Sequence, residues 1–100
     1  MPGALQGFRI IDVTQVISGP LATRILADQG ADVIKVEPPG LGDPQRVFYQ
    51  FSFNMRSSTP NAGFHVDNKG KRSVVLDLKS EEGKAAMEEL LAGADVFVSN

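Results

Sequence analysis

Apolar and polar positions along the first third of the chain follow a strand-then-helix order. Residues 8–13 (FRIIDV) form a short apolar, β-branched run, which predicts a buried strand. After the turn-forming residues 18–20 (SGP), a helical pattern begins at Leu21, with Pro20 at a first helical position and Gly30 at the stop. The apolar residues of this short predicted helix are Leu21, Ala22, Ile25 and Leu26.

A second apolar run, residues 32–37 (DVIKVE), ends abruptly at residues 38–40 (PPG), because proline cannot donate to a sheet ladder. Strand, helix and strand within about 30 residues are typical of the βαβ unit, which has parallel strands and a right-handed crossover. The sheet is therefore expected to be parallel here.

The second half of the chain repeats this order after a long irregular segment. Residues 40–61 mix glycine, proline and polar residues with aromatic side chains, which favours a docked excursion or a ligand wall over regular sheet. Residues 73–78 (SVVLDL) and 95–99 (DVFVS) predict a third and a fourth strand. The whole pattern predicts an α/β fold with a Rossmann-like open sheet that is mainly parallel.

Between these two strands the pattern predicts a helix capped by Ser80 and ending near Gly93. Glu81 and Glu82 fall in its first turn, where acids interact favourably with the helix dipole. Its apolar face is expected to comprise Ala86, Met87, Leu90 and Leu91.

Composition limits the kinds of function. With 42% hydrophobic and 22% charged residues and a net charge of -2, the chain is typical of a soluble protein, and no nucleic-acid partner is expected. It has no cysteine and a single histidine, so we expect no metal site. No apolar stretch approaches the ~20 residues of a membrane span, so we expect a cytoplasmic protein with no membrane partner.

The loops after the strands are the candidate ligand site, because ligands of open α/β sheets bind beyond the carboxyl ends of the strands. The first loop has one glycine where a dinucleotide fingerprint needs three, and no P-loop lysine is present, so NAD, FAD and nucleotide hydrolysis are not expected. The basic residues in or near the loops are candidate partners for phosphate groups: Arg46, Lys69, Lys71, Arg72 and Lys79.

Several of these residues also have plain structural interpretations. Residues 69–72 (KGKR) are equally typical of a solvated turn. Asp12 and Asp77, near strand ends, are more often capping or turn residues than catalytic acids. His65 has no partner acid or nucleophile that would make it a general base. The residues alone therefore predict only an α/β domain that binds a ligand.

Six phrases, followed by Gly83 and residues 94–96 (ADV), carry a family resemblance over essentially the whole chain. They are LQG leading into IID at residues 5–12, SGP at 18–20, LADQGADVIKVE at 26–37, GDPQR at 42–46, NKGKRS at 68–73 and LDLK at 76–79. In order and spacing they resemble the class III CoA-transferases, which include formyl-CoA and carnitine CoA-transferases and alpha-methylacyl-CoA racemase. The resemblance implies that residues 1–100 are the N-terminal part of the large, Rossmann-like domain of that fold.

In that family the strand ends bind coenzyme A. The resemblance implies that Ile17 and Ser18 meet the pantetheine or acyl end of CoA. Leu76, Asp77, Leu78 and Lys79 are expected along its adenosine and phosphate end, with Ser99 and Asn100 contributing from the loop after the next strand. Lys79 is the preferred phosphate partner.

Three positions depart from the family pattern. Pro38 stands where several members carry an arginine that contacts the adenine and phosphate part of CoA. Gln15 stands where some formyl-CoA-type members have histidine, and Ile17 where some have a glutamine that helps bind the oxalyl group. The resemblance therefore implies an acyl partner less polar than oxalate.

The resemblance also implies the chemistry of the parent protein. Its transferases use an aspartate that forms mixed anhydrides and an aspartyl-CoA thioester, and this residue is expected beyond residue 100, so the chain alone is expected to be inactive. The implied substrates are an acyl-CoA and a carboxylic acid, and the implied assembly is an intertwined homodimer. The alternatives are an acyl-CoA racemase or isomerase, which abstracts the alpha proton, and a non-catalytic CoA-binding module.

Overall fold

The computed structural model describes residues 3–47 and 62–100. Its four strands form one parallel sheet in the order β3-β2-β1-β4. They are β1 (Arg9–Asp12), β2 (Asp32–Glu37), β3 (Arg72–Val75) and β4 (Val96–Val98). The predicted α/β fold with an open parallel sheet is confirmed.

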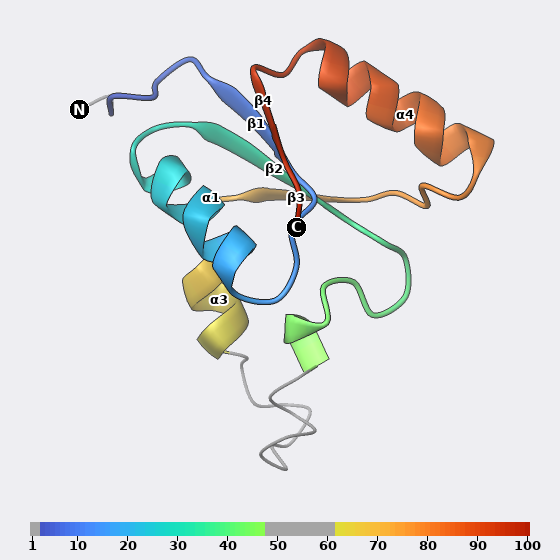
Figure 1. Cartoon of the computed structure of the whole chain (residues 1–100), viewed down its shortest axis with the longest axis horizontal. Helices are drawn as coiled ribbons and strands as arrows, with labels where there is room; N and C mark the ends of the chain where they lie inside the picture. The colour runs from blue at the N-terminus through green and yellow to red at the C-terminus, as the bar shows by residue number, and fades with distance from the viewer. Residues whose placement is uncertain (1–2, 48–61) are drawn as a thin grey trace.

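Helices cover both faces of this sheet. The helices α1 (Ser18–Asp28) and α3 (Ala62–Asn68) lie together on one side, and α4 (Glu81–Ala92) lies on the other (Figure 1). The result is a layer of helix on each side of a central sheet, an arrangement typical of doubly wound α/β domains.

The two cores follow from the alternation of side chains along the strands. Ile10 and Val33 pack on the α1 side, while the next residues, Ile11 and Ile34, pack on the α4 side against Met87. This explains why apolar residues stand next to one another in β1 and β2, since both faces of these strands are covered.

The chain path creates a topological switch point. It runs from β1 outward to β2 and β3, and then returns to place β4 on the other side of β1. The carboxyl ends of β1 and β4 therefore lie side by side where the strand order reverses, which is where ligands of such sheets bind.

The helix α1 begins at Ser18, earlier than predicted. Pro20 still falls in its first turn, where a missing N–H breaks no helical bond. Gly30 follows the helix at φ 102° and ends it as predicted. Two of the four apolar residues of the predicted helical pattern, Ala22 and Ile25, are exposed, because the buried line of the helix runs through Pro20 and Thr23.

The strand β3 is shorter than predicted, since it ends at Val75 and residues 76–79 lead into α4. The predicted cap of α4 is confirmed, as the Ser80 hydroxyl accepts a hydrogen bond from the Gly83 amide at 3.0 Å. Leu91 does not belong to the buried face of α4 and is 39% exposed. The short helix α3 had no counterpart in the sequence prediction.

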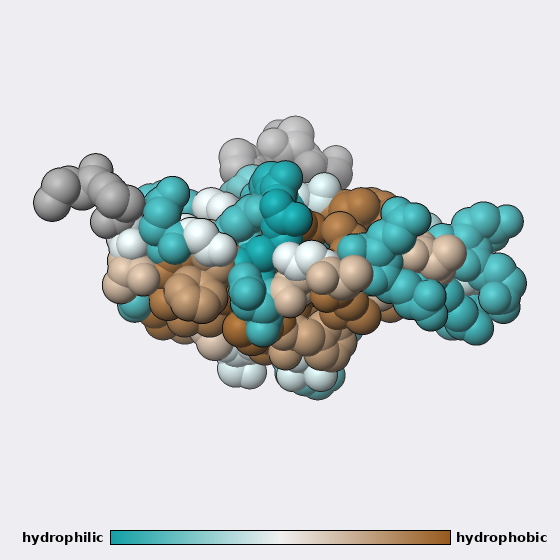
Figure 2. Space-filling view, turned by 90° about the horizontal axis from the view of Figure 1, so that it is seen from above, coloured by the Kyte–Doolittle hydropathy of each residue, from teal (hydrophilic) through white to brown (hydrophobic). Residues whose placement is uncertain are grey.

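Both edge strands leave large apolar side chains exposed. Val75 of β3 and Val96 and Phe97 of β4 are about half exposed, and brown apolar patches interrupt the teal surface in Figure 2. No helix among the described residues is long and apolar enough to cross a membrane. The predicted excursion over residues 40–61 lies mostly outside the described residues.

Candidate functional site

The loop after β1 is clasped to the end of β4 at the switch point. The Gln15 amide donates to Asn100 Oδ1 at 3.1 Å, and Asn100 Nδ2 donates back to the Gln15 carbonyl at 3.0 Å. A side-chain amide thereby satisfies both backbone groups of Gln15, much as a neighbouring strand would. The clasp brings two predicted regions, around Ile17 and at Asn100, to one place.

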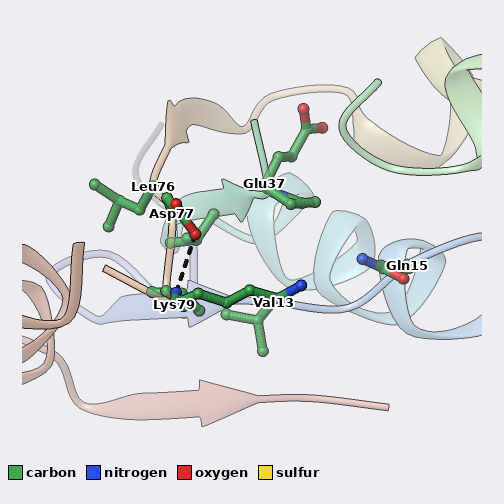
Figure 3. Close-up of a pocket in the computed structure, with 9 residues that line it drawn as sticks. Val13, Gln15, Glu37, Leu76, Asp77 and Lys79 are labelled. Atoms are coloured by element: carbon green, nitrogen blue, oxygen red, sulfur yellow. Dashed lines mark hydrogen bonds between the residues drawn. The ribbon is translucent and has the colours of Figure 1, made fainter. Parts of the chain in front are cut away.

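A hollow of about 200 Å³ lies beside this clasp, at the carboxyl ends of β1, β2 and β3 (Figure 3). Its floor is apolar, from Val13, Val36 and Leu76, which also pack on the core beneath α4. The remaining lining residues are Gln15, Glu37, Pro38, Asp77, Leu78 and Lys79.

Lys79 is the cationic side chain of this hollow. In Figure 3 it extends alongside Val13, with its ammonium on the side of Gln15. Lys35, Arg46 and Lys71 each have an acidic partner. Within residues 3–47 and 62–100, no carboxylate pairs with the Lys79 ammonium. An anionic group of a ligand is a suitable partner for this charge.

A tight turn sets the position of Lys79. The Asp77 carboxylate accepts a hydrogen bond from the Lys79 amide at 3.0 Å, and the Asp77 carbonyl accepts one from the Ser80 amide at 3.0 Å. This use of Asp77 is the turn role that its sequence position favours. The first turn of α4 packs directly on it, because a Cβ at Gly83 would collide with the Asp77 carbonyl oxygen.

The opposite face of the same edge holds a buried polar network that sequence reasoning missed. The Lys71 ammonium lies 2.8 Å from the Asp12 carboxylate, and their side chains are 2% and 0% exposed. Thr23 also donates to Asp12, at 2.8 Å, and Thr14 donates through both its amide and its hydroxyl. Lys71 is therefore neither a residue of a solvated turn nor a phosphate partner, and both interpretations of it were wrong.

Ionisation of this pair is shifted by its surroundings. Burial raises the pKa of Asp12, but the hydrogen bonds from Lys71, Thr14 and Thr23 outweigh burial, so the pKa lies below its ordinary value. Burial also lowers the pKa of the Lys71 ammonium, against the opposing effect of Asp12. Asp12 is thus a charged structural group.

A second buried pair joins Lys35 of β2 to Asp43. The ammonium lies 2.8 Å from the carboxylate, and the side chains are 2% and 0% exposed. Lys35 also donates to the Thr14 carbonyl at 3.2 Å, and Asp43 accepts from the Val16 amide at 3.0 Å. The loop after β1 is therefore held by Lys35 of β2 and by Asp43 of the segment that follows β2.

Two of the remaining phosphate candidates are also engaged in ion pairs. Arg46 binds the buried carboxylate of Glu37 at 3.0 Å and lies over the ring of Phe64, 3.9 Å from its centroid. Arg72 lies at the amino edge of the sheet, where it binds Asp32 at 2.6 Å. Arg72 is therefore not a phosphate partner in the hollow as expected, because it lies at the amino end of β3 and the hollow lies at the carboxyl ends of the strands.

His65 of α3 is exposed and packs edge-on against Phe64, with ring centroids 5.9 Å apart. It is a surface histidine, as its sequence context favours. Among the described residues, no three histidine or acidic side chains gather into a group that would hold a metal ion.

With this geometry in place, similarity to known proteins decides the family. The sequence profile of CoA-transferase family III matches residues 5–100. The chain belongs to this family.

Curated members of CoA-transferase family III resemble the chain over nearly its whole length. It is 44% identical to a succinate–glutarate CoA-transferase of Agrobacterium fabrum, over 96% of the chain, and 45% identical to a succinyl-CoA:mesaconate CoA-transferase of Haloarcula hispanica, over 98%. It is 47% identical to a formyl-CoA:oxalate CoA-transferase of a Bradyrhizobium species, over 100%. The chain spans about a quarter of these relatives, 24%, 24% and 23% of their lengths.

Solved structures show the same family fold. A CaiB/BaiF family protein from Brucella suis superposes with a TM-score of 0.86 at 36% identity, covering 100% of the chain and 26% of that protein. A hypothetical protein from Mycobacterium tuberculosis gives 0.81 at 41% identity, covering 95% of the chain and 24% of that protein.

The predicted site residues of this family member all fall at the carboxyl edge but form two groups. Leu76, Asp77, Leu78 and Lys79 line the hollow. Ile17, Ser18, Ser99 and Asn100 surround the switch point beside it and are exposed. Gln15 and Pro38, which the sequence marked only as departures from the family pattern, also line the hollow. Sequence reasoning missed the lining residues Val13, Val36 and Glu37; their position at the carboxyl ends of two buried strands was the available signal.

Proposed function

We propose that the carboxyl edge of this sheet binds coenzyme A, and that the protein containing the chain moves CoA between an acyl-CoA and a carboxylic acid. The observation that carries the proposal is the family match over residues 5–100 together with a hollow that offers Lys79 to an anion. The curated relatives named above are all CoA-transferases, which favours transfer over racemisation.

The hollow suits one section of a long ligand. At about 200 Å³ it is smaller than the roughly 300–1,000 Å³ of ordinary small-molecule sites. Its apolar floor suits an uncharged section of CoA, and Lys79 suits a phosphate at the rim. The remaining length would run along the carboxyl edge, past Gln15 and toward Ile17 and Asn100, where the other predicted site residues lie.

Ile17 bears on the acyl partner. Its side chain is 45% exposed beside the switch point and offers no hydrogen-bond donor. An apolar side chain here favours acyl groups less polar than oxalate, because a desolvated carboxylate beside isoleucine has no partner. We therefore propose a substrate acid other than oxalate.

The chemistry itself is proposed from family resemblance. An aspartate beyond residue 100 attacks the acyl-CoA thioester, giving a mixed anhydride and free CoA thiolate. The thiolate attacks the aspartyl carbonyl, releasing the first acid and leaving an aspartyl-CoA thioester. The carboxylate of the second acid then attacks the aspartyl-CoA thioester, which releases CoA thiolate and forms a second mixed anhydride. The thiolate attacks the acyl carbonyl of this anhydride, which gives the new acyl-CoA and restores the aspartate.

Within the described residues, the acids nearest the strand ends have other roles. Asp12 and Asp43 are bound to buried lysines, and Glu37 is bound to Arg46. These contacts support a nucleophile from elsewhere in the protein. The intertwined homodimer and the cytoplasmic location stay predictions.

An exchange assay on the native gene product tests the function. Each of several acyl-CoA donors, including succinyl-CoA and formyl-CoA, is incubated with an isotopically labelled acid, and labelled acyl-CoA is measured. Transfer of CoA to the labelled acid is expected. Exchange of the alpha proton in deuterated water without transfer would favour the racemase instead, and binding of CoA with neither reaction would favour a binding module.

A further inference from the structure

The conformation of Val16 requires an external constraint. Its φ is 76°, in the left-handed region that β-branched residues rarely adopt. Such a residue keeps this conformation only where surrounding contacts fix it, and such positions concentrate at functional sites. The Val16 amide donates to Asp43 Oδ1 at 3.0 Å, so a buried carboxylate supplies one such contact.

Asp43 is itself rigidly placed. It is 0% exposed, its Oδ2 accepts from the Lys35 ammonium at 2.8 Å, and its Oδ1 also accepts from the Gln45 amide at 2.9 Å. Lys35 extends from the central strand β2 and donates to the Thr14 carbonyl as well. One ion pair thus binds the loop after β1 at two backbone groups, the Thr14 carbonyl and the Val16 amide.

The loop after β1, which this ion pair holds, carries candidate ligand contacts. Gln15 lines the hollow, and the side chains of Val16 and Ile17 are 39% and 45% exposed. The backbone groups of Gln15 are taken by Asn100 from the other side. Side chains of other elements thus satisfy the backbone of this loop, in the conformation that places Gln15 in the hollow.

We propose that Asp43, fixed by Lys35, is a positioning residue of the CoA site: it holds Val16 in the left-handed conformation and so presents Gln15 and Ile17 to the bound acyl-CoA. The inference rests on the proposed function and adds to it the device that shapes the loop. Asp43 itself is buried and acts through Val16. A merely structural pair would stabilise the fold without setting affinity for the ligand.

Two matched double variants of the native gene product separate these roles. Lys35→Met with Asp43→Asn removes both buried charges but keeps a side-chain oxygen that accepts from the Val16 amide. Lys35→Met with Asp43→Leu removes the charges and the acceptor together. The measurements are the Kd for CoA by calorimetry, and kcat and KM for the acyl-CoA in the exchange assay.

The asparagine variant is expected to keep Kd and KM within about threefold of the native values. The leucine variant is expected to raise both about tenfold while kcat changes less, as a loss of ligand binding requires. A structural role alone would lower the active fraction, and hence the apparent kcat, at unchanged KM. Equal Kd and KM for the two variants would therefore overturn the positioning role.

A second pair acts on the loop and covers the case in which the double variants do not fold. Val16→Gly keeps the amide donor and accepts positive φ, whereas Val16→Pro removes the donor and fixes φ near -65°. The proline variant is expected to bind CoA at least about tenfold more weakly than the glycine variant. Equal binding by these two variants would overturn the positioning role alone, and absence of CoA binding by the native protein would overturn it together with the proposed function.

Discussion

The Lys71 ammonium lies 2.8 Å from the Asp12 carboxylate, although the two residues are 59 apart in the sequence. The contact ties the turn that enters β3 to the residue that ends β1. Since both side chains are buried, neither charge has water to replace a lost partner. The pair therefore fixes the sheet edge on which the candidate site is built.

Replacing Lys71 by methionine is expected to destabilise the fold by about 3–5 kcal/mol, because it leaves the Asp12 carboxylate buried without its cation. The measurement is the free energy of unfolding from urea titration. The double variant Lys71→Met with Asp12→Asn carries no buried charge and is expected to regain most of the loss. Equal stability of the single variant and the native protein would contradict the buried pair.

The same pair predicts part of the acid sensitivity. The pKa of Asp12 is lower in the folded than in the unfolded chain, so its stabilisation is complete above its ordinary pKa of 3.8 and is lost as pH falls below it through the folded pKa. The native protein is thus expected to lose stability more steeply below about pH 4 than the double variant at these positions. Urea titrations of both from pH 7 to 3 measure the difference, and parallel curves would exclude a contribution of Asp12.

The turn before α4 predicts an effect at Gly83. A methyl group there collides with the Asp77 carbonyl oxygen, so Gly83→Ala is expected to cost about 1–3 kcal/mol and to displace Lys79. Gly93→Ala is the matched control, because its nearest neighbour outside the helix is 3.6 Å away. The stability of the control, measured by thermal unfolding, is expected to stay within about 1 kcal/mol of that of the native protein. A fully stable Gly83→Ala protein would refute the close packing.

Local pattern was enough to predict the strands, the crossover and α4 with its Ser80 cap. These depend on apolar spacing and capping chemistry within a few residues. The local pattern failed where tertiary contacts determine the structure, as in the length of β3. Residues 76–78 (LDL) have the composition of a strand but form the turn that packs on Gly83.

The buried charges were the larger omission. Lys35 sits inside an apolar run and Lys71 inside a basic turn, and nothing nearby in sequence identifies Asp43 or Asp12 as their partners. Long-range pairing is visible only once the strand order is known. The edge of the sheet that holds the candidate site was, by contrast, predictable from topology rules alone.

Acyl preference is predicted to respond to Ile17. Ile17→Gln adds a hydrogen-bonding amide at the switch point and is expected to raise kcat/KM for oxalate, relative to a less polar acid, about tenfold. Ile25→Gln makes the same change at an equally exposed isoleucine of α1 and is expected to leave the ratio unchanged. The exchange assay with both acids measures this ratio of kcat/KM values. An equal change of the ratio in the two variants would count against a role of Ile17 in specificity.

Calorimetric titration of CoA into the native gene product and its Lys79→Ala variant tests the coenzyme site most directly. Lys69→Ala is the control. Lys69 was a phosphate candidate from the sequence, but it is exposed in the turn that enters β3 and does not line the hollow, so this variant removes the same charge away from the site. Loss of one charge-assisted contact is expected to raise the Kd of Lys79→Ala about 10- to 100-fold, with the control within about twofold of native. An unchanged Kd in Lys79→Ala would contradict the assignment of this hollow to coenzyme A.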